Sequence, residues 1–238
     1  MILAAGRGER MRPLTDSCPK PLLKVRGKAL LDWHVEALAR SGFHKLVINT
    51  AWLGEQIKDH FGRSRKQGVR ELLSISYSNE GMDFGGALET AGGIARALPL
   101  LGEVFWVLAG DVFMPGFEFS PTAVGRFKAG GRLAHLWLVP NPEHNPRGDF
   151  GLGADGLALN LAAADPVPRY TYSTIGLYRR AFFDALPAGN PQGVKAALAP
   201  LLRAAMDSGQ VSAELYEGDW TDVGTPARLA ELNQTLTN

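Results

Sequence analysis

The first half of the chain alternates between segments with the hydrophobic pattern of a strand and segments with that of a helix, and this alternation constrains the fold more than any other feature. It begins with a short buried strand over 2–5, a glycine-containing loop, and a helix over 29–40 that ends at Gly42. Further strands are predicted over 45–49, 73–77 and 104–109, and further helices over 52–61 and 89–98. Strands that alternate with helices favour an α/β fold in which helices cover a sheet.

The second half of the chain is less regular. Its predicted elements are helices over 121–129, 196–206 and 227–236, strands over 133–139, 172–179 and 212–216, and a loop-rich stretch over 141–156. Thr225 is predicted to cap the last helix, and Pro226 to occupy its first position. Because there is no internal repeat and no linker long enough to separate two domains, the sequence predicts one domain with a mixed sheet.

The composition excludes several classes of protein. The 25 Lys and Arg residues are matched by 24 Asp and Glu residues, which leaves a formal net charge of +1. Proteins that neutralise many nucleic-acid phosphates carry a clear basic excess, so we expect no nucleic-acid binding. A hydrophobic content of 45% over 238 residues suffices for a core and excludes a disordered chain. A single cysteine, Cys18, no signal-like start and no apolar stretch of spanning length favour a cytoplasmic protein without a membrane segment.

The loop after the first predicted strand is the most informative segment. Gly6 and Gly8 let the backbone approach a ligand closely, with N–H groups able to point at phosphate oxygens. These two glycines fit neither the dinucleotide fingerprint nor the P-loop, and alone they are equally compatible with a surface turn. Residues 1–28 carry seven basic and two acidic side chains, a local charge of +5. Basic side chains around an exposed glycine loop suit a polyanion such as a triphosphate; those nearest the glycines are Arg7, Arg10, Arg12 and Lys20.

The same segment carries a family resemblance. Leu-Ala-Ala-Gly-x-Gly-x-Arg-Met-x-Pro-Leu-Thr, followed by Pro-Lys-Pro-Leu, resembles the N-terminal signature of the sugar-1-phosphate nucleotidyltransferases. The likeness continues in family order through 89–93, Gly110-Asp111 and 222–225. It implies an enzyme that joins a nucleoside triphosphate to a sugar 1-phosphate and releases pyrophosphate. It also implies a single Rossmann-like three-layer α/β/α domain with a mixed, mainly parallel sheet over 1–238, with a nucleotide-binding part over about 1–115 and a sugar-binding part over about 116–238.

Within that family the chain most resembles the short bacterial uridylyltransferases that act on N-acetylmuramate α-1-phosphate in peptidoglycan recycling. The features that carry this likeness are the compact length, segments 49–54 and 147–150, and Lys195 ahead of 199–203. The implied reaction is Mg²⁺-dependent transfer from UTP. Two alternatives remain open, namely a thymidylyl- or guanylyltransferase for glucose or mannose 1-phosphate, and a non-catalytic nucleotide-sugar-binding module. Segment 165–168 stands where hexose-1-phosphate enzymes carry Glu-Lys-Pro, which disfavours the thymidylyltransferase branch.

The resemblance implies roles for individual residues. The residues expected to hold the triphosphate and the transferred phosphoryl group are Arg10 and Lys20. Those expected along the nucleotide are Ala5, Gly6, Gly8, Glu80, Ala91 and Gly92. Those expected near the sugar are Gly148 and Lys195, and the Mg²⁺ ligands are Asp111 and Asp222.

Several of these roles also follow from physical chemistry. Asp111 comes directly after a buried strand, and open α/β sheets bind ligands at the carboxyl ends of their strands. Two carboxylates suit a hard cation that also binds phosphates. The attacking oxygen of a sugar 1-phosphate is already ionised at neutral pH, so no general base is needed. We therefore interpret His34, His60 and His135 as packing or surface residues, and expect a monomer because no β-helix repeats or long coiled coil follow the domain.

Overall fold

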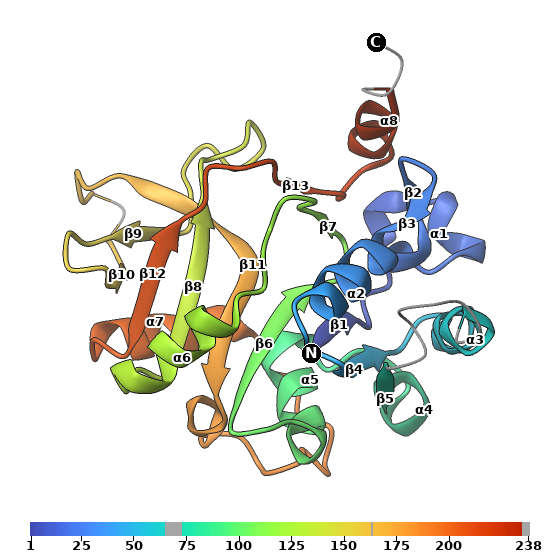
Figure 1. The fold of residues 1–238 in the computed structure, drawn as a ribbon, viewed down its shortest axis with the longest axis horizontal. Helices are drawn as coiled ribbons and strands as arrows, with labels where there is room; N and C mark the ends of the chain where they lie inside the picture. The colour runs from blue at the N-terminus through green and yellow to red at the C-terminus, as the bar shows by residue number, and fades with distance from the viewer. Residues whose placement is uncertain (65–72, 163, 235–238) are drawn as a thin grey trace.

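The computed structural model describes residues 1–64, 73–162 and 164–234. In these segments nine strands form one sheet around which the fold is built (Figure 1). Its strands are β1 (Ile2–Ala4), β4 (Lys45–Thr50), β5 (Ser74–Asn79), β6 (Val104–Ala109), β8 (Ala134–Val139), β9 (Phe150–Leu152), β10 (Ala158–Leu159), β11 (Arg169–Arg179) and β12 (Val211–Leu215). Seven of them lie side by side in the order β12-β8-β11-β6-β1-β4-β5.

The direction of the strands confirms the predicted mixed, mainly parallel sheet. Within that row of seven, β11 is antiparallel to its neighbours β6 and β8, whereas the other paired strands are parallel. The beginning of β11 also pairs with β9, and β9 with β10, which extends the sheet on one side. A shift in register between Tyr172 and Gly176 bends β11 where it passes from one set of partners to the other.

Alternate side chains of the central strands enter two separate cores. On β6, Trp106 and Leu108 belong to one core, and Phe105 and Val107 to the other. The first core is covered by α2 (Leu30–Arg40), α3 (Gly54–Ser64) and α6 (Pro121–Gly130), and the second by α5 (Glu89–Ala97) and α7 (Leu198–Asp207). Because helices cover both faces of the sheet, the three-layer α/β/α prediction is confirmed.

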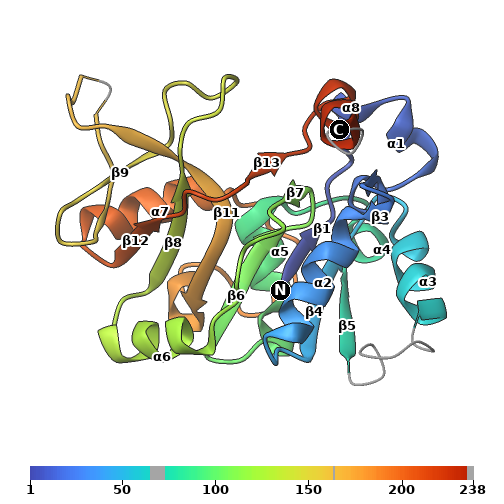
Figure 2. The same cartoon turned by 45° about the horizontal axis from the view of Figure 1, so that its top comes forward.

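A third, smaller core joins segments from opposite ends of the chain. Met11, Phe113 and Val223 are buried in it, and Leu229 of α8 packs against it. The elements involved are the hairpin of β2 (Lys24–Val25) and β3 (Lys28–Ala29), the strand pair of β7 (Val112–Phe113) and β13 (Thr221–Asp222), and α8 (Pro226–Gln234). Figure 2 shows α8 beside the hairpin, to which Asn233 is bonded through the Lys24 carbonyl at 3.1 Å. This core holds residue 222 close to the N-terminal loop.

The predicted elements agree well with the observed ones, and the exceptions are short. The β6 strand occupies the predicted residues, and Thr225 Oγ1 accepts a hydrogen bond from the Arg228 amide at 3.3 Å, which confirms the predicted cap of α8. Pro226 is the first residue of α8, as predicted, and the predicted helix end at 236 lies outside the described residues. The stretch 141–156 was expected to be loop-rich but contains β9. The other elements that the pattern did not predict are β10, α1 (Leu14–Ser17), α4 (Glu80–Phe84), both two-stranded ladders, and 3₁₀ turns at Glu9–Met11, Lys20–Leu22, Leu98–Leu100 and Arg180–Phe183.

The interpretation of His34 as a packing residue leads to a pH prediction. His34 lies buried on α2, where its Nε2 is 2.8 Å from the Val112 carbonyl, and burial lowers its pKa from 6.5 to about 4. Between pH 6.5 and pH 4, His34 is therefore protonated in the unfolded chain but neutral in the folded chain. The free energy of unfolding falls as the pH drops through this range. We expect a loss approaching about 3 kcal/mol in the wild type and a flatter profile in His34→Gln. Urea denaturation at pH 7 and pH 4.5 measures the free energy of unfolding of both proteins. An equal loss of this free energy in the wild type and in His34→Gln would contradict the assignment.

Candidate active site

Three adjoining cavities follow the carboxyl ends of β1 and β6. The large cavity, of about 570 Å³, and the middle cavity, of about 240 Å³, share a wall formed by Leu3, Glu89, Thr90 and Ala109. The middle cavity and the loop cavity, of about 210 Å³, share Gly6, Lys20 and Asp111. The three cavities thus form one continuous cleft, in the position where open α/β sheets bind ligands.

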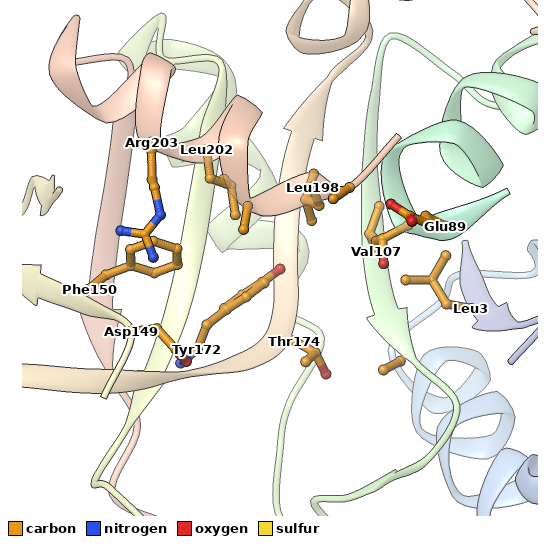
Figure 3. A pocket seen from close by; sticks show the side chains of 14 residues that line it. Leu3, Glu89, Val107, Asp149, Phe150, Tyr172, Thr174, Leu198, Leu202 and Arg203 are labelled. Atoms are coloured by element: carbon orange, nitrogen blue, oxygen red, sulfur yellow. The ribbon is translucent and has the colours of Figure 1, made fainter. Parts of the chain in front are cut away.

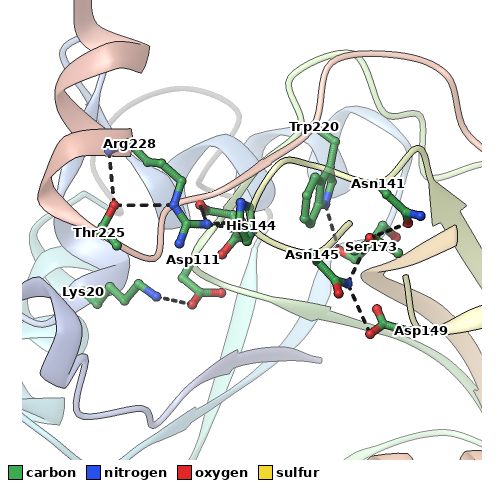
Figure 4. A network of polar contacts seen from close by, with 12 residues as sticks. Lys20, Asp111, Asn141, His144, Asn145, Asp149, Ser173, Trp220, Thr225 and Arg228 are labelled. Atoms are coloured by element: carbon green, nitrogen blue, oxygen red, sulfur yellow. Dashed lines mark hydrogen bonds and ion pairs between the residues drawn. The ribbon is translucent and has the colours of Figure 1, made fainter. Parts of the chain in front are cut away.

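Two of the predicted phosphate-binding side chains face the loop cavity. Lys20 begins a 3₁₀ turn after Pro19, and its Nζ donates to Asp111 Oδ2 at 2.5 Å (Figure 4). Arg10 lines the same cavity and is exposed, and in the described part of the chain it has no hydrogen bond or ion pair. Gly8 allows this loop to close, because its φ is +70° and a Cβ would lie 3.0 Å from the Thr15 side chain. The loop therefore presents two cations at one end of the cleft.

Arg7 and Arg12, which the sequence grouped with these cations, are bound elsewhere. Arg7 pairs with Asp16 at 3.0 Å and stacks 3.8 Å from the centre of the Trp52 ring. Arg12 pairs with the same carboxylate at 2.9 Å. Together they hold the pKa of Asp16 below its ordinary value, with the hydrogen bond from Arg7 as the main cause. Of the four basic residues around the loop, these two stabilise its fold, and Arg10 and Lys20 face the cleft.

The two predicted metal ligands are brought together by the ladder of β7 and β13. Asp222 lies opposite Val112, and the Val223 amide donates to the Asp111 carbonyl at 2.8 Å. Each carboxylate has one oxygen bound to a cation, because Asp111 Oδ2 accepts from Lys20 and Asp222 Oδ1 pairs with Arg228. In the described segments, the other oxygen of each carboxylate has no hydrogen-bond partner.

This donor set fits Mg²⁺. Magnesium is usually held by one or two carboxylates, and it keeps waters and binds substrate phosphates at its other positions. Within the described residues, no group of three or more His, Cys, Asp and Glu side chains could form an all-protein cage. Two carboxylates, each with one oxygen that has no hydrogen-bond partner in the described segments, match this requirement.

Sequence reasoning missed two residues that hold Asp222. His144 Nε2 lies 2.7 Å from Asp222 Oδ1, and Arg228 of α8 contacts the same oxygen and, at 3.0 Å, the Asp222 carbonyl (Figure 4). Gly224 leaves room for this arrangement, since a Cβ there would lie 2.6 Å from the Arg228 guanidinium. No local pattern marks His144. Arg228 could have been noticed because it stands three residues after the helix cap Thr225.

Glu80 lines the middle cavity but uses its carboxylate for structure. Oε1 accepts from Asn49 Nδ2 at 2.7 Å and Oε2 from the Leu88 amide at 2.8 Å, while Asn49 Oδ1 accepts from the Ala4 amide at 2.7 Å. Burial raises the pKa of Glu80. Ala5 and Gly6, also predicted along the nucleotide, line this cavity as well. Glu80 therefore braces the strand ends that form the cavity wall.

Ala91 and Gly92 lie beneath the cleft surface. Their amides donate to the Ala196 carbonyl at 2.9 and 3.1 Å, and a Cβ on Gly92 would lie 2.5 Å from the Val194 carbonyl. Their neighbours Glu89 and Thr90 are the residues of α5 that line the cavities. The contact of Ala91 and Gly92 with a nucleotide stays a prediction.

The large cavity contains a cation that was not predicted. Arg203 of α7 lines it, donates to Asn160 at 3.0 Å, and lies 5.4 Å from the centre of the Phe150 ring (Figure 3). Lys195, the predicted cation of this region, is exposed and does not belong to the cavity lining. Arg203 is the last residue of the segment 199–203 that carried the family likeness. Its position in a predicted helix did not indicate that its side chain faces the cavity.

Gly148 shapes the same wall without lining it. Its φ is +62°, and a Cβ would lie 2.8 Å from Asn141 Oδ1. The next residue, Asp149, lines the cavity and accepts hydrogen bonds from the Tyr172 amide at 2.8 Å and from Asn145 Nδ2 at 3.3 Å. A glycine at 148 is thus required for the tight turn that carries Asp149.

Comparison with known proteins decides the family. The family model for nucleotidyl transferases matches residues 1–238. The chain belongs to the nucleotidyl transferase family. It is 48% identical to an N-acetylmuramate alpha-1-phosphate uridylyltransferase of Neisseria meningitidis serogroup B, over 97% of this chain and 95% of that relative. It is 32% identical to a protein of the same name from Caulobacter vibrioides, over 97% and 96%. The family resemblance seen in the sequence is therefore confirmed.

A solved structure shows that the fold is shared as well. A Bacillus anthracis protein, assigned as a glucose-1-phosphate thymidylyltransferase and crystallised with sucrose, superposes with a TM-score of 0.77 at 20% sequence identity. The match covers 98% of this chain and 93% of that one. In the segments described for this nucleotidyl transferase, no helix combines the length and apolar character needed to cross a bilayer.

The different surroundings of Arg10 and Arg12 give a prediction for this transferase. Arg10→Ala should lower kcat/KM by roughly 10- to 100-fold, the loss expected when a charged hydrogen bond to a phosphate is removed. Arg12→Ala removes a similar charge two residues away but breaks only exposed pairs with Asp16 and Glu9, so its kinetics should match those of the parent. Steady-state measurements with varied nucleotide compare the two; equal effects would show that only the overall charge of the loop matters.

Proposed function

We propose that the chain transfers a uridylyl group from UTP to N-acetylmuramate α-1-phosphate, forming UDP-N-acetylmuramate and pyrophosphate. The observation that carries this proposal is Arg203 in the large cavity, at the far end of a cleft that begins with Lys20 and Arg10. N-acetylmuramate carries a lactyl carboxylate that glucose, mannose and N-acetylglucosamine lack, and a guanidinium is a suitable partner for it. The names of the two relatives above support the same substrates. The reaction would serve peptidoglycan recycling in the cytoplasm.

In this proposal the two ends of the cleft hold different substrates. The nucleotide lies in the part formed by about 1–115, along Ala5, Gly6 and Gly8, with Glu80, Ala91 and Gly92 supporting the base and ribose region. The sugar lies in the part formed by about 116–238, beside Gly148, with Lys195 as an outer cation. Leu3, Glu89, Thr90 and Ala109 form the wall between these two regions.

The residues of the loop cavity account for the chemistry. An ionised phosphate oxygen of the sugar 1-phosphate attacks the α-phosphorus of UTP, an oxygen–phosphorus bond forms, and the bond to the departing pyrophosphate breaks without a proton transfer. Lys20 and Arg10 hold the phosphates in line and neutralise the charge that develops on them. When Mg²⁺ is bound by Asp111 and Asp222, it supplies further charge neutralisation.

A matrix of substrates tests the proposal. Pyrophosphate release is measured for four nucleoside triphosphates against the 1-phosphates of N-acetylmuramate, N-acetylglucosamine, glucose and mannose. We expect the highest kcat/KM for UTP with N-acetylmuramate 1-phosphate. Faster turnover of dTTP with glucose 1-phosphate, or of GTP with mannose 1-phosphate, would refute the substrate assignment. Binding of nucleotide without turnover of any pair would favour the non-catalytic module.

Arg203→Gln tests the sugar end of the cleft separately. Losing a charged hydrogen bond to the lactyl group should raise the KM for N-acetylmuramate 1-phosphate by roughly 10- to 100-fold. N-acetylglucosamine 1-phosphate, which has no carboxylate, should be turned over as in the parent. Arg126→Gln on α6 is the control, because Arg126 is exposed and does not line the cavity. An equal loss with both sugars would assign Arg203 a structural role.

A further inference from the structure

Glu89 lies where the large cavity and the middle cavity meet. It is the charged residue of their shared wall, whose other members are Leu3, Thr90 and Ala109. Figure 3 shows its carboxylate on the side of the large cavity opposite Arg203. Within the described residues this carboxylate has no hydrogen bond or ion pair, so it is available to a ligand.

The backbone at Glu89 is strained. Its φ is +60°, a left-handed conformation that glycine adopts freely and that costs free energy for a residue with a Cβ. Among the non-glycine residues with positive φ in the described segments, Thr174 also lines the large cavity. Residues with a strained backbone are more frequent at functional sites, where packing of the surrounding structure holds them in that conformation. A glutamate at a position suited to glycine indicates that its carboxylate is needed.

The other carboxylate of the large cavity is already used. Both oxygens of Asp149 accept hydrogen bonds within the protein, from the Tyr172 amide and from Asn145. Glu89 is therefore the carboxylate of this cavity that can serve a ligand. An ionised carboxylate accepts hydrogen bonds and repels phosphates, and N-acetylmuramate 1-phosphate carries no cationic group, so the partner of Glu89 on the sugar is a neutral donor. Sugar hydroxyls and an acetamido N–H are such donors.

We propose that Glu89 is a specificity-determining residue that accepts a hydrogen bond from a hydroxyl or amide N–H of the bound sugar. This role rests on the proposed function, in which the large cavity holds the sugar of the sugar 1-phosphate. Glu89 and Arg203 then bind opposite ends of the sugar. Glu89 accepts a hydrogen bond from a neutral donor, and Arg203 donates to the lactyl carboxylate.

Three substitutions in the full chain separate the carboxylate from the backbone. Glu89→Ala and Glu89→Gly should both raise the KM for the sugar 1-phosphate by roughly tenfold or more while the KM for UTP changes less than about twofold. Glu89→Gln keeps a carbonyl acceptor and should fall between them and the parent. Glu89→Gly relieves the strain that Glu89→Ala retains, so its Tm should be higher by roughly 2–4 °C. Glu55→Ala, which removes an exposed carboxylate of α3, is the control.

The possible outcomes are distinct. A higher KM for UTP with an unchanged KM for the sugar, or parental kinetics in all three variants, would overturn the proposal. If another sugar 1-phosphate proves the better substrate, the proposed reaction fails, and Glu89 is judged by the KM of that sugar. If no pair is turned over, calorimetric titration of the parent and of Glu89→Ala with UDP-N-acetylmuramate and with UDP tests the role of Glu89. Weaker binding of UDP-N-acetylmuramate by Glu89→Ala, with unchanged binding of UDP, supports the role. Equal affinities of the two proteins for UDP-N-acetylmuramate, or no binding of it to the parent, overturn the role.

Discussion

Asp111→Asn should reduce nucleotidyl transfer by roughly a hundred- to a thousandfold, the scale on which lost electrostatic stabilisation of a transition state is felt. The amide removes one of the two negative charges proposed to hold Mg²⁺ and leaves Lys20 without its ionic partner at 2.5 Å. Asp222→Asn should act in the same direction. The measurements are kcat against Mg²⁺ concentration and, independently of activity, the rise in Tm that Mg²⁺ and UTP produce together.

Asp219→Asn is the matched control for these variants. Asp219 lies three residues before Asp222, is exposed, and stands outside the ladder of β7 and β13 that joins Asp222 to Asp111. Its substitution should leave both the Mg²⁺ dependence and the Tm response as in the parent. Parental activity of Asp111→Asn at low Mg²⁺ concentration would exclude Asp111 as a ligand, and a similar loss in Asp219→Asn would indicate a general effect of charge.

Lys20→Met should also lower kcat by roughly a hundred- to a thousandfold, because it removes the cation that pairs with Asp111 and that binds the transferred phosphoryl group in the proposed reaction. Methionine keeps the apolar stem of a side chain that is only 11% exposed, so the protein should remain folded. Lys24→Met, on the exposed side of the β2 hairpin, is the control.

A double variant shows whether Lys20 and Asp111 act together. Because these side chains are directly paired, their effects should not add, and Lys20→Met with Asp111→Asn should lose little more activity than the weaker single variant. Fully additive losses would mean that the pair seen here is broken when substrates bind.

The fold could be predicted largely because its long elements have local signals. Several residues of β6 and of α2 are buried at regular intervals. Each of these elements is therefore indicated by several apolar positions in the sequence. Elements fixed by a few distant contacts have no such pattern. The ladder of β7 and β13 joins residues more than a hundred positions apart through two pairs, and the bend of β11 depends on a threonine in an unfavourable conformation.

The site was predicted unevenly for a related reason. Lys20, Asp111 and Asp222 stand in segments whose order resembles a family, and the structure places them together. Charge alone did not separate Arg10 from Arg7 and Arg12, because their difference depends on where the Asp16 carboxylate lies. His144 and Arg203 were missed because their contacts are with residues distant in the sequence and form only in the folded chain. For Lys195 the surrounding sequence suggested a cation, but the cavity takes its cation from the neighbouring helix.

The small size of β13 determines how the site is lost. Only two residue pairs attach this strand to β7, whereas the ladders of the central sheet are longer. Separating Asp222 from Asp111 therefore requires a local opening of this ladder and of the third core around Val223, and local openings cost less free energy than global unfolding. On heating, a molecule can lose the close placement of Asp111 and Asp222 while its sheet is intact. Inactivation should then precede the loss of secondary structure, and ligands that join the two carboxylates would protect the enzyme more than its unfolding temperature suggests.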